Sequence, residues 1–325
     1  MQRPACVRRT GRQQKRHEVS ITLRKEEENQ FLDHPKKARA VKHLPALALL
    51  SITVIWGWTF VLVKQNMTEI GPLSFLAARF GVAFLVLAIM LHKTLRQIDR
   101  RSVIRGAAVG VALFLGYLFQ TWGLVYTTAT KSGLLTGLSV VIVPIVASML
   151  LRKRVHLTVW LGALFAAGGL FLLVAGKGQL GAMNKGDVLT LACAVSFALH
   201  IILVDRFVRD IDYRQLLLVQ VGVVGLLSLI GAVTLERRVP VLSTSLIEGI
   251  LVTGIFATAV ALYVLNRFQS HSTASYTAII LTMEPAFAGL FGFLLLGETM
   301  GPWQWLGSAL ILLGMAIPSI WKHPT

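Results

Sequence analysis

Hydrophobic residues fill long tracts along most of the chain, and polar residues gather in short stretches between these tracts. A tract of about 18 or more apolar residues is long enough to cross a hydrocarbon core about 30 Å thick. The tracts are apolar on every side, whereas a helix on the surface of a soluble protein has one polar face. We predict an all-α polytopic membrane protein with ten transmembrane helices, at 45–64, 71–92, 105–122, 129–151, 158–176, 187–205, 213–235, 246–265, 273–296 and 303–321.

The composition agrees with this fold class. Hydrophobic residues make up 55% of the chain and charged residues only 14%, against about a quarter charged in a typical soluble domain. The net charge of +17 does not indicate nucleic-acid binding, because basic residues in a membrane protein gather at cytoplasmic loops. Cys6 and Cys193 have neither the number nor the spacing of a disulfide framework or a metal site. We expect no nucleic-acid partner, no metal and no cofactor.

Residues 1–44 form a polar and strongly basic segment. It has no apolar region of its own, so it does not resemble a cleaved secretory signal. We expect a disordered basic cytoplasmic tail. Its basic residues could also contact anionic membrane lipids, and an incorrectly chosen start codon would explain the segment as well.

The distribution of basic residues predicts the orientation in the membrane. If the amino terminus is cytoplasmic, the connections on the inside contain most of the Lys and Arg residues, such as Lys93, Arg101, Arg154 and Arg209. Connections on the outside contain fewer. This asymmetry predicts that both termini are cytoplasmic and that the number of crossings is even.

The two halves of the chain resemble each other. Matching motifs occur in the fourth and ninth tracts and again in the fifth and tenth, where each is followed by a second glycine at the same spacing. These motifs are Ile142-Val143-Pro144 with Met283-Glu284-Pro285, and Trp160-Leu161-Gly162 with Trp305-Leu306-Gly307, the second glycines being Gly169 and Gly314. Chance alignment of helices rich in small residues is the alternative explanation.

Each half would contain five crossings, the first half at 45–176 and the second at 187–321. A repeat with an odd number of crossings inserts its second copy upside down, so we predict two inverted five-helix repeats. Inverted repeats recur in secondary transporters, where two halves rock about a central site.

Several motifs, taken together in order and spacing, resemble the EamA-type drug/metabolite transporter superfamily over roughly residues 45–320. They are Trp56-Gly57-Trp58-Thr59-Phe60, Arg79-Phe80, the segment from Thr136 to Pro144, Glu284-Pro285 and Leu296-Gly297-Glu298. The resemblance implies ten helices in two inverted halves, a bacterial cytoplasmic (inner) membrane, and transport of small metabolites or drugs, often outward.

Three ionisable residues within the tracts are candidates for substrate binding or ion coupling, because a charge at bilayer depth costs about 2.5–3.5 kcal/mol on insertion scales. Glu284 precedes a proline near the middle of its tract and could take up a proton or receive a substrate amine. Arg79 could bind an anionic group or fix helix packing by an ion pair or a carbonyl contact. His200 could relay protons or form a hydrogen bond across the bundle.

Aromatic and amide side chains within or near the ends of the tracts suggest a cavity. The candidates for substrate contact are Trp56, Trp58, Tyr117, Gln120, Tyr263 and Tyr276, with Gln220 and Asn266 as further polar groups inside the tracts. Ordinary packing is the alternative for each of them.

The leading hypothesis is a secondary active transporter that exports amino acids, related metabolites or drug-like molecules, with protons as a candidate coupling ion and lipids as its surroundings. The chain contains no ATP-binding P-loop, and so no sign of primary active transport, and it has no HExxH or CxxC spacing and no nucleophile elbow. Its polar residues within the tracts are isolated, whereas an enzyme would place two or more catalytic groups together. An intramembrane enzyme acting on a lipid-linked substrate, and a non-transporting membrane partner or channel, are the alternatives. The sequence does not predict an oligomeric state.

Overall fold

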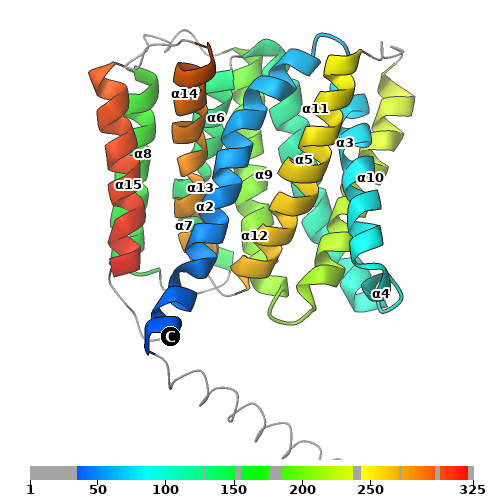
Figure 1. The fold of residues 1–325 in the computed structure, drawn as a ribbon, viewed down its shortest axis with the longest axis horizontal. Coiled ribbons are helices and arrows are strands. Elements are labelled where there is room, and N and C mark those ends of the chain that lie inside the picture. The colour runs from blue at the N-terminus through cyan, green and yellow to red at the C-terminus, as the bar shows by residue number, and fades with distance from the viewer. Residues whose placement is uncertain are drawn as a thin grey trace, which may run out of the picture. The chain divides into compact units, whose positions relative to one another are not determined.

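The computed structural model describes residues 35–127, 129–150, 155–175, 184–236, 243–270, 273–296 and 301–320, and within these ranges all regular structure is helical. The elements, drawn in Figure 1, are α2 (Pro35–Asn66), α3 (Pro72–Met90), α4 (His92–Leu95), α5 (Arg100–Tyr126), α6 (Ala129–Gly137), α7 (Ser139–Leu150), α8 (Leu157–Ala175), α9 (Lys185–Phe207), α10 (Tyr213–Leu235), α11 (Thr244–Gly254), η1 (Ile255–Val260), α12 (Ala261–Gln269), α13 (Ala274–Leu281), α14 (Met283–Leu296) and α15 (Pro302–Ile320). The chain divides into two compact units, Met1–Leu47 and Ala48–Thr325.

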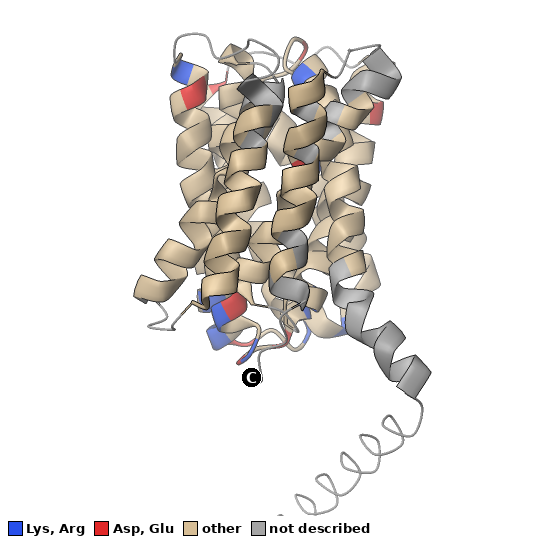
Figure 2. Ribbon diagram, turned by 90° about the vertical axis from the view of Figure 1, so that its left-hand side faces the viewer, with Lys and Arg blue, Asp and Glu red and all other residues tan. Residues whose placement is uncertain are grey.

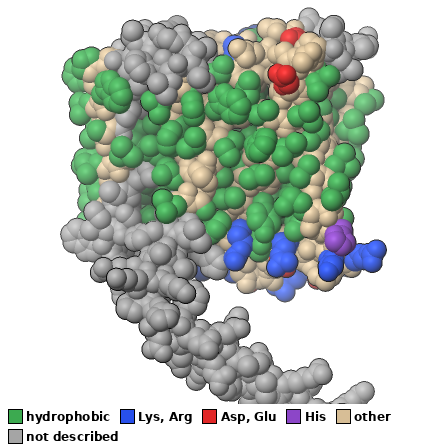
Figure 3. Space-filling view, viewed as in Figure 1, with side chains coloured by type: hydrophobic (Ala, Val, Ile, Leu, Met, Phe, Trp, Pro, Cys, Tyr) green, Lys and Arg blue, Asp and Glu red, His purple; other side chains and the backbone are tan. Residues whose placement is uncertain are grey.

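The second unit has the surface of a multi-pass membrane protein. Six helical segments are long and apolar enough to cross a membrane, namely Leu47–Asn66, Pro72–Met90, Arg100–Tyr126, Lys185–Phe207, Tyr213–Leu235 and Thr244–Gln269. Shorter apolar helices lie at Leu135–Met149, Leu157–Gly169 and Trp305–Gly314. Large apolar side chains such as Ile89 and Val233 are 75% and 77% exposed, and Figure 3 shows a broad hydrophobic surface above a row of basic side chains. A broad apolar surface on helices long enough to cross a bilayer is typical of a protein that faces lipid.

Helices occupy most of every predicted tract within the described residues, but the first helix begins earlier than predicted. α2 begins at Pro35, whereas the tract begins at 45. The added residues are mostly Lys, Ala and Arg, which favour helix without being apolar. Hydropathy therefore predicted the membrane-spanning part of this helix but not the residue at which the helix begins. Residues 1–34 of the predicted tail lie outside the described residues, as do Gly297 and Glu298.

The fourth and ninth tracts are each interrupted near the middle. Leu138 forms a turn between α6 and α7, and Thr282 forms a turn between α13 and α14. Pro144 and Pro285 follow these turns, and neither proline can donate a backbone hydrogen bond to the preceding turn of helix. The two interruptions therefore lie in matching tracts of the two halves.

The eighth tract contains a different irregularity. Between α11 and α12, residues 255–260 form the π-helix η1. The Thr258 hydroxyl donates to Thr253 O at 2.8 Å, five residues earlier. A π-helical turn leaves backbone carbonyls available to side chains from other helices, which is why such turns are frequent at functional sites.

Close contacts show that matching helices of the two halves pack against each other in opposite directions. A Cβ on Gly169 of α8 would lie 2.5 Å from Gly307 O of α15, and a Cβ on Gly314 would lie 2.6 Å from Gly162 O. The start of each helix therefore meets the end of the other. The glycines let the two backbones approach closely.

The pair formed by α3 and α10 follows the same rule. Gly231, late in α10, lies against Leu73 at the start of α3, and Gly222, earlier in α10, lies against Phe84 near the end of α3. α5 and α9 also run antiparallel, because Gly116 meets Phe197 while Gly123, further along α5, meets Thr190.

The glycine contact between α8 and α15 predicts a specific sensitivity. Gly169→Ala should lower the midpoint of thermal unfolding by several degrees, because the added methyl group meets the backbone of α15 and overpacking costs about 1–3 kcal/mol. Gly168→Ala is the matched control, since its Cβ would have nothing within 4 Å. Unfolding of the purified protein in detergent measures both variants. Equal midpoints for the two would contradict the packing described.

Candidate functional site

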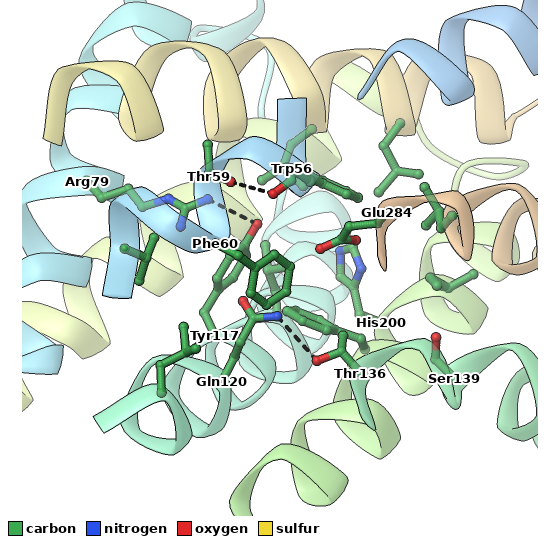
Figure 4. Close-up of a pocket in the computed structure, with 18 residues that line it drawn as sticks. Trp56, Thr59, Phe60, Arg79, Tyr117, Gln120, Thr136, Ser139, His200 and Glu284 are labelled. Carbon is green, nitrogen blue, oxygen red and sulfur yellow. Dashed lines mark hydrogen bonds between the residues drawn. The ribbon is translucent and has the colours of Figure 1, made fainter. Parts of the chain in front are cut away.

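A cavity lies among the helices of the second unit and is lined by residues from both halves of the chain. The first half of the chain lines it with residues of α2, α3, α5, α6 and α7, and the second half with residues of α9, α12, α13 and α14. The empty volume is about 700 Å³, including the part open to its surroundings, which is within the range of small-molecule sites. Figure 4 shows polar and aromatic side chains converging on it.

The structure brings six of the nine predicted site residues to this cavity. They are Glu284, Arg79, His200, Trp56, Tyr117 and Gln120. The other three do not line it. Trp58 is 38% exposed on the outer side of α2, because residues two apart on a helix point in different directions. The Tyr263 hydroxyl lies 3.2 Å from that of Tyr213, and Tyr276 is partly buried in α13.

Arg79 is held against the π-helix at the side of the cavity. Its Nε donates to Thr258 Oγ1 at 2.7 Å, and its Nη2 lies 3.4 Å from Ala257 O. Because the Thr258 hydroxyl already donates to Thr253 O, its oxygen is left to accept from Arg79. These contacts agree with the carbonyl contact considered for Arg79. Its Nη1 has no hydrogen-bond partner among the described residues.

The guanidinium group of Arg79 also lies over an aromatic ring. Arg79 Cζ lies 4.7 Å from the centroid of the Tyr117 ring, which is a cation–π distance. Tyr117 in turn meets Phe80 and Phe197 edge to face, with centroid distances of 5.1 and 5.2 Å. The three rings come from α3, α5 and α9, so this stack fixes the relative positions of helices from both halves.

Trp56 binds to the same irregular turn. Its indole Nε1 donates to Ala257 O at 2.7 Å. The carbonyl of Ala257 therefore accepts from α2 and lies near the Arg79 guanidinium of α3. The π-helix joins these two helices to the second half of the chain at the edge of the cavity.

Glu284 is turned into the cavity from the first turn of α14 (Figure 4). The break at Thr282 starts a new helix just before it, and unpaired N–H groups at a helix start favour a nearby negative charge. No hydrogen bond or ion pair joins its carboxylate to another side chain in the described part of the chain. Its carboxylate is therefore an acceptor that pairs with none of the described side chains.

His200 lines the cavity from α9 and is held from behind. Its Nε2 lies 2.9 Å from Gln220 Oε1 of α10, and both residues are buried. This agrees with a histidine hydrogen-bonded across the bundle. The other ring nitrogen, Nδ1, has no hydrogen-bond partner within the described ranges.

Sequence reasoning missed the polar residues at the interrupted helix. Thr136 and Ser139 flank the turn between α6 and α7 and line the cavity. Gln120 Nε2 is 3.5 Å from Thr136 Oγ1, which in turn lies 3.7 Å from Cys193 Sγ. The matching prolines of the fourth and ninth tracts were the available signal, because interrupted helices in matching positions point to transporter binding sites.

The apolar surface, antiparallel matching helices and a polar cavity between the halves are the features of a membrane transporter fold. The chain belongs to the EamA-like transporter family, whose model matches twice, at residues 43–175 and 184–320. The resemblance to this family is thus confirmed.

Relatives extend over nearly the full length of the chain. An uncharacterized transporter of Archaeoglobus fulgidus is 34% identical over 89% of this chain and 91% of its own. The uncharacterized transporter YyaM of Bacillus subtilis is 28% identical over 86% and 95%. The uncharacterized inner membrane transporter YedA of Escherichia coli is 24% identical over 85% and 90%. These names indicate transporters rather than enzymes.

A solved crystal structure shares the fold. The TM-score is 0.71 with 18% sequence identity, over 85% of this chain and 96% of that chain. At this identity the likeness concerns the fold alone.

The hydrogen bond from Arg79 to the π-helix can be tested with two threonine variants. Thr258→Val removes the acceptor for Arg79 Nε and should lower the thermal midpoint, because leaving a charged buried donor unpaired costs about 1.5–3 kcal/mol. Thr253→Val is the control, since among the described residues that hydroxyl bonds only Gly249 O and Ile250 O in its own helix. If both valine variants unfold at the same temperature, the bond does not have the role assigned here.

Proposed function

We propose that the protein is a secondary active transporter that exports small metabolites, such as amino acids or related compounds, or drug-like molecules across the cytoplasmic membrane by alternating access. The observation that carries the proposal is a pair of opposite charges that face one cavity without pairing with each other. Glu284 comes from the second half and Arg79 from the first.

The cost of leaving Glu284 and Arg79 unpaired within the membrane favours a ligand that pairs with both of them. A charge buried at membrane depth needs a partner or water. Arg79 offers an anionic group the Nη1 donors that no described residue accepts from, and Glu284 offers carboxylate oxygens to an ammonium group or a proton. The rings of Phe60, Tyr117 and Phe197 line the cavity and supply apolar surface. This chemistry suits a molecule with an amine, with or without a carboxylate, attached to an apolar body.

Alternating access rests on the arrangement of the halves. Antiparallel packing of α8 with α15 and of α3 with α10 supports two inverted five-helix repeats, near 45–176 and 187–321, with ten crossings in total. The interruptions at Leu138 and Thr282 allow α6–α7 and α13–α14 each to count as one crossing. Rocking of one half against the other would open the cavity to either side in turn.

The distribution of charge supports the proposed orientation. Figure 2 shows charged residues at the two ends of the bundle and few between them. Arg101 and Arg105 at the start of α5 reach Asp210, after α9, at 3.7 and 2.9 Å, so these connections share one end. We assign that end, rich in Arg, to the cytoplasm. Both termini would then be cytoplasmic.

The proposal predicts the effect of changing Glu284. In proteoliposomes, wild-type protein should give saturable flux that responds to an imposed proton gradient. Glu284→Gln cannot release a proton, so this flux should lose its response to the gradient. Its KM for amine substrates should rise about tenfold or more, because a hydrogen bond to a charged group is worth about 1.5–3 kcal/mol.

The control is Glu248→Gln, the same substitution at an exposed position of α11, which should transport like the wild type. Flux through the wild type that never saturates would indicate a channel instead. A gradient response that survives Glu284→Gln would remove Glu284 from the coupling role, and an absence of any gradient-sensitive flux across a broad panel of small solutes would overturn the proposal.

A further inference from the structure

A chain of buried side chains runs from the cavity to a backbone carbonyl of α12. His200 Nε2 lies 2.9 Å from Gln220 Oε1, and Gln220 Nε2 lies 2.9 Å from Asn266 Oδ1. The chain ends where Asn266 Nδ2 donates to Leu262 O at 2.8 Å. The three side chains are at most 2% exposed, and they come from α9, α10 and α12.

The carbonyl at the end fixes the direction of every bond in the chain. A backbone carbonyl can only accept, so the Asn266 amide must present its nitrogen to Leu262 O and its oxygen to Gln220. Gln220 must then donate through Nε2 and accept through Oε1. His200 Nε2 is therefore the donor of the first bond and carries a hydrogen.

The consequence appears at the other side of the imidazole ring. In a neutral histidine with hydrogen on Nε2, Nδ1 has a lone pair and can only accept. Nδ1 has no partner among the described residues, and His200 lines the cavity together with Glu284 (Figure 4). A reversed amide order would place two carbonyl oxygens against each other at Leu262.

We propose that Gln220 and Asn266 are positioning residues that hold neutral His200 with its hydrogen on Nε2, so that Nδ1 is a second acceptor in the cavity for an N–H donor of the transported molecule. With Glu284, His200 would then bind an ammonium group from two sides. The substrate role in this inference rests on the proposed function, whereas the state of the ring does not.

The ring state can be measured directly. Nitrogen NMR of the full chain with labelled histidine, reconstituted in lipid, reports which ring nitrogen carries hydrogen, and loss of a signal in His200→Gln assigns it. At a pH where the ring is neutral, hydrogen on Nε2 is expected in the wild type. Gln220→Leu should produce a mixture of both forms. Asn266→Ala should do the same while leaving Gln220 in place, which keeps a test available if the leucine variant does not fold.

Ser228→Ala is the matched control on α10, because Ser228 is buried and its hydroxyl has no partner in the described part of the structure. It should leave His200 unchanged. In transport, Gln220→Leu should raise the KM of amine substrates about five- to tenfold with little change in maximal rate, as expected for the loss of one hydrogen bond.

Hydrogen on Nδ1 in the wild type, or an unchanged ring in both Gln220→Leu and Asn266→Ala, would overturn the positioning role. A changed hydrogen position on the His200 ring in Gln220→Leu, together with an unchanged KM, would overturn the proposed contact between His200 and the substrate. Absence of transport by the wild type would overturn the proposed function while leaving the ring measurement valid.

Discussion

The cost of placing charge in an apolar solvent governs how this protein is built. Arg79 is 3% exposed in a helix that is surrounded by lipid and other helices. An unpaired guanidinium group there would have a high free-energy cost. The structure lowers this cost with a hydroxyl whose direction is already set by Thr253 O, with a carbonyl released by η1, and with the face of Tyr117. The π-helix η1, in the second half of the chain, thus lies against Arg79, the buried charge of the first half.

Interrupted helices provide the remaining polar groups. A regular helix satisfies its own backbone and presents only side chains, which in this chain are mostly apolar. The turns at Leu138 and Thr282 expose helix ends in the middle of the bundle, and Ser139, Thr136 and Glu284 lie beside them. Because these turns occur in matching tracts, the two halves contribute polar groups to the same cavity. Binding chemistry is thus concentrated where helical order is broken.

Much of this could be predicted from the sequence because lipid imposes a simple rule on composition. Apolar tracts located the helices, and polar residues inside those tracts pointed to Glu284, Arg79, His200 and Gln120. The rule fails for residues that are tolerated in either environment. Trp56 and Trp58 are equally compatible with a cavity and with a membrane surface, so only the rotation of α2, set by packing, separates them.

The irregular elements were not predictable for a different reason. The π-helix η1 is bonded through Thr258 to Arg79, a residue far away in sequence, and its own residues are ordinary apolar and small ones. The bonds among His200, Gln220 and Asn266 likewise join three helices. Hydropathy marks each of these polar residues as costly, yet it contains no information on which two of them meet. The chemistry of the cavity therefore follows from helix packing, which fixes the partners, while composition fixes only the list of groups that require one.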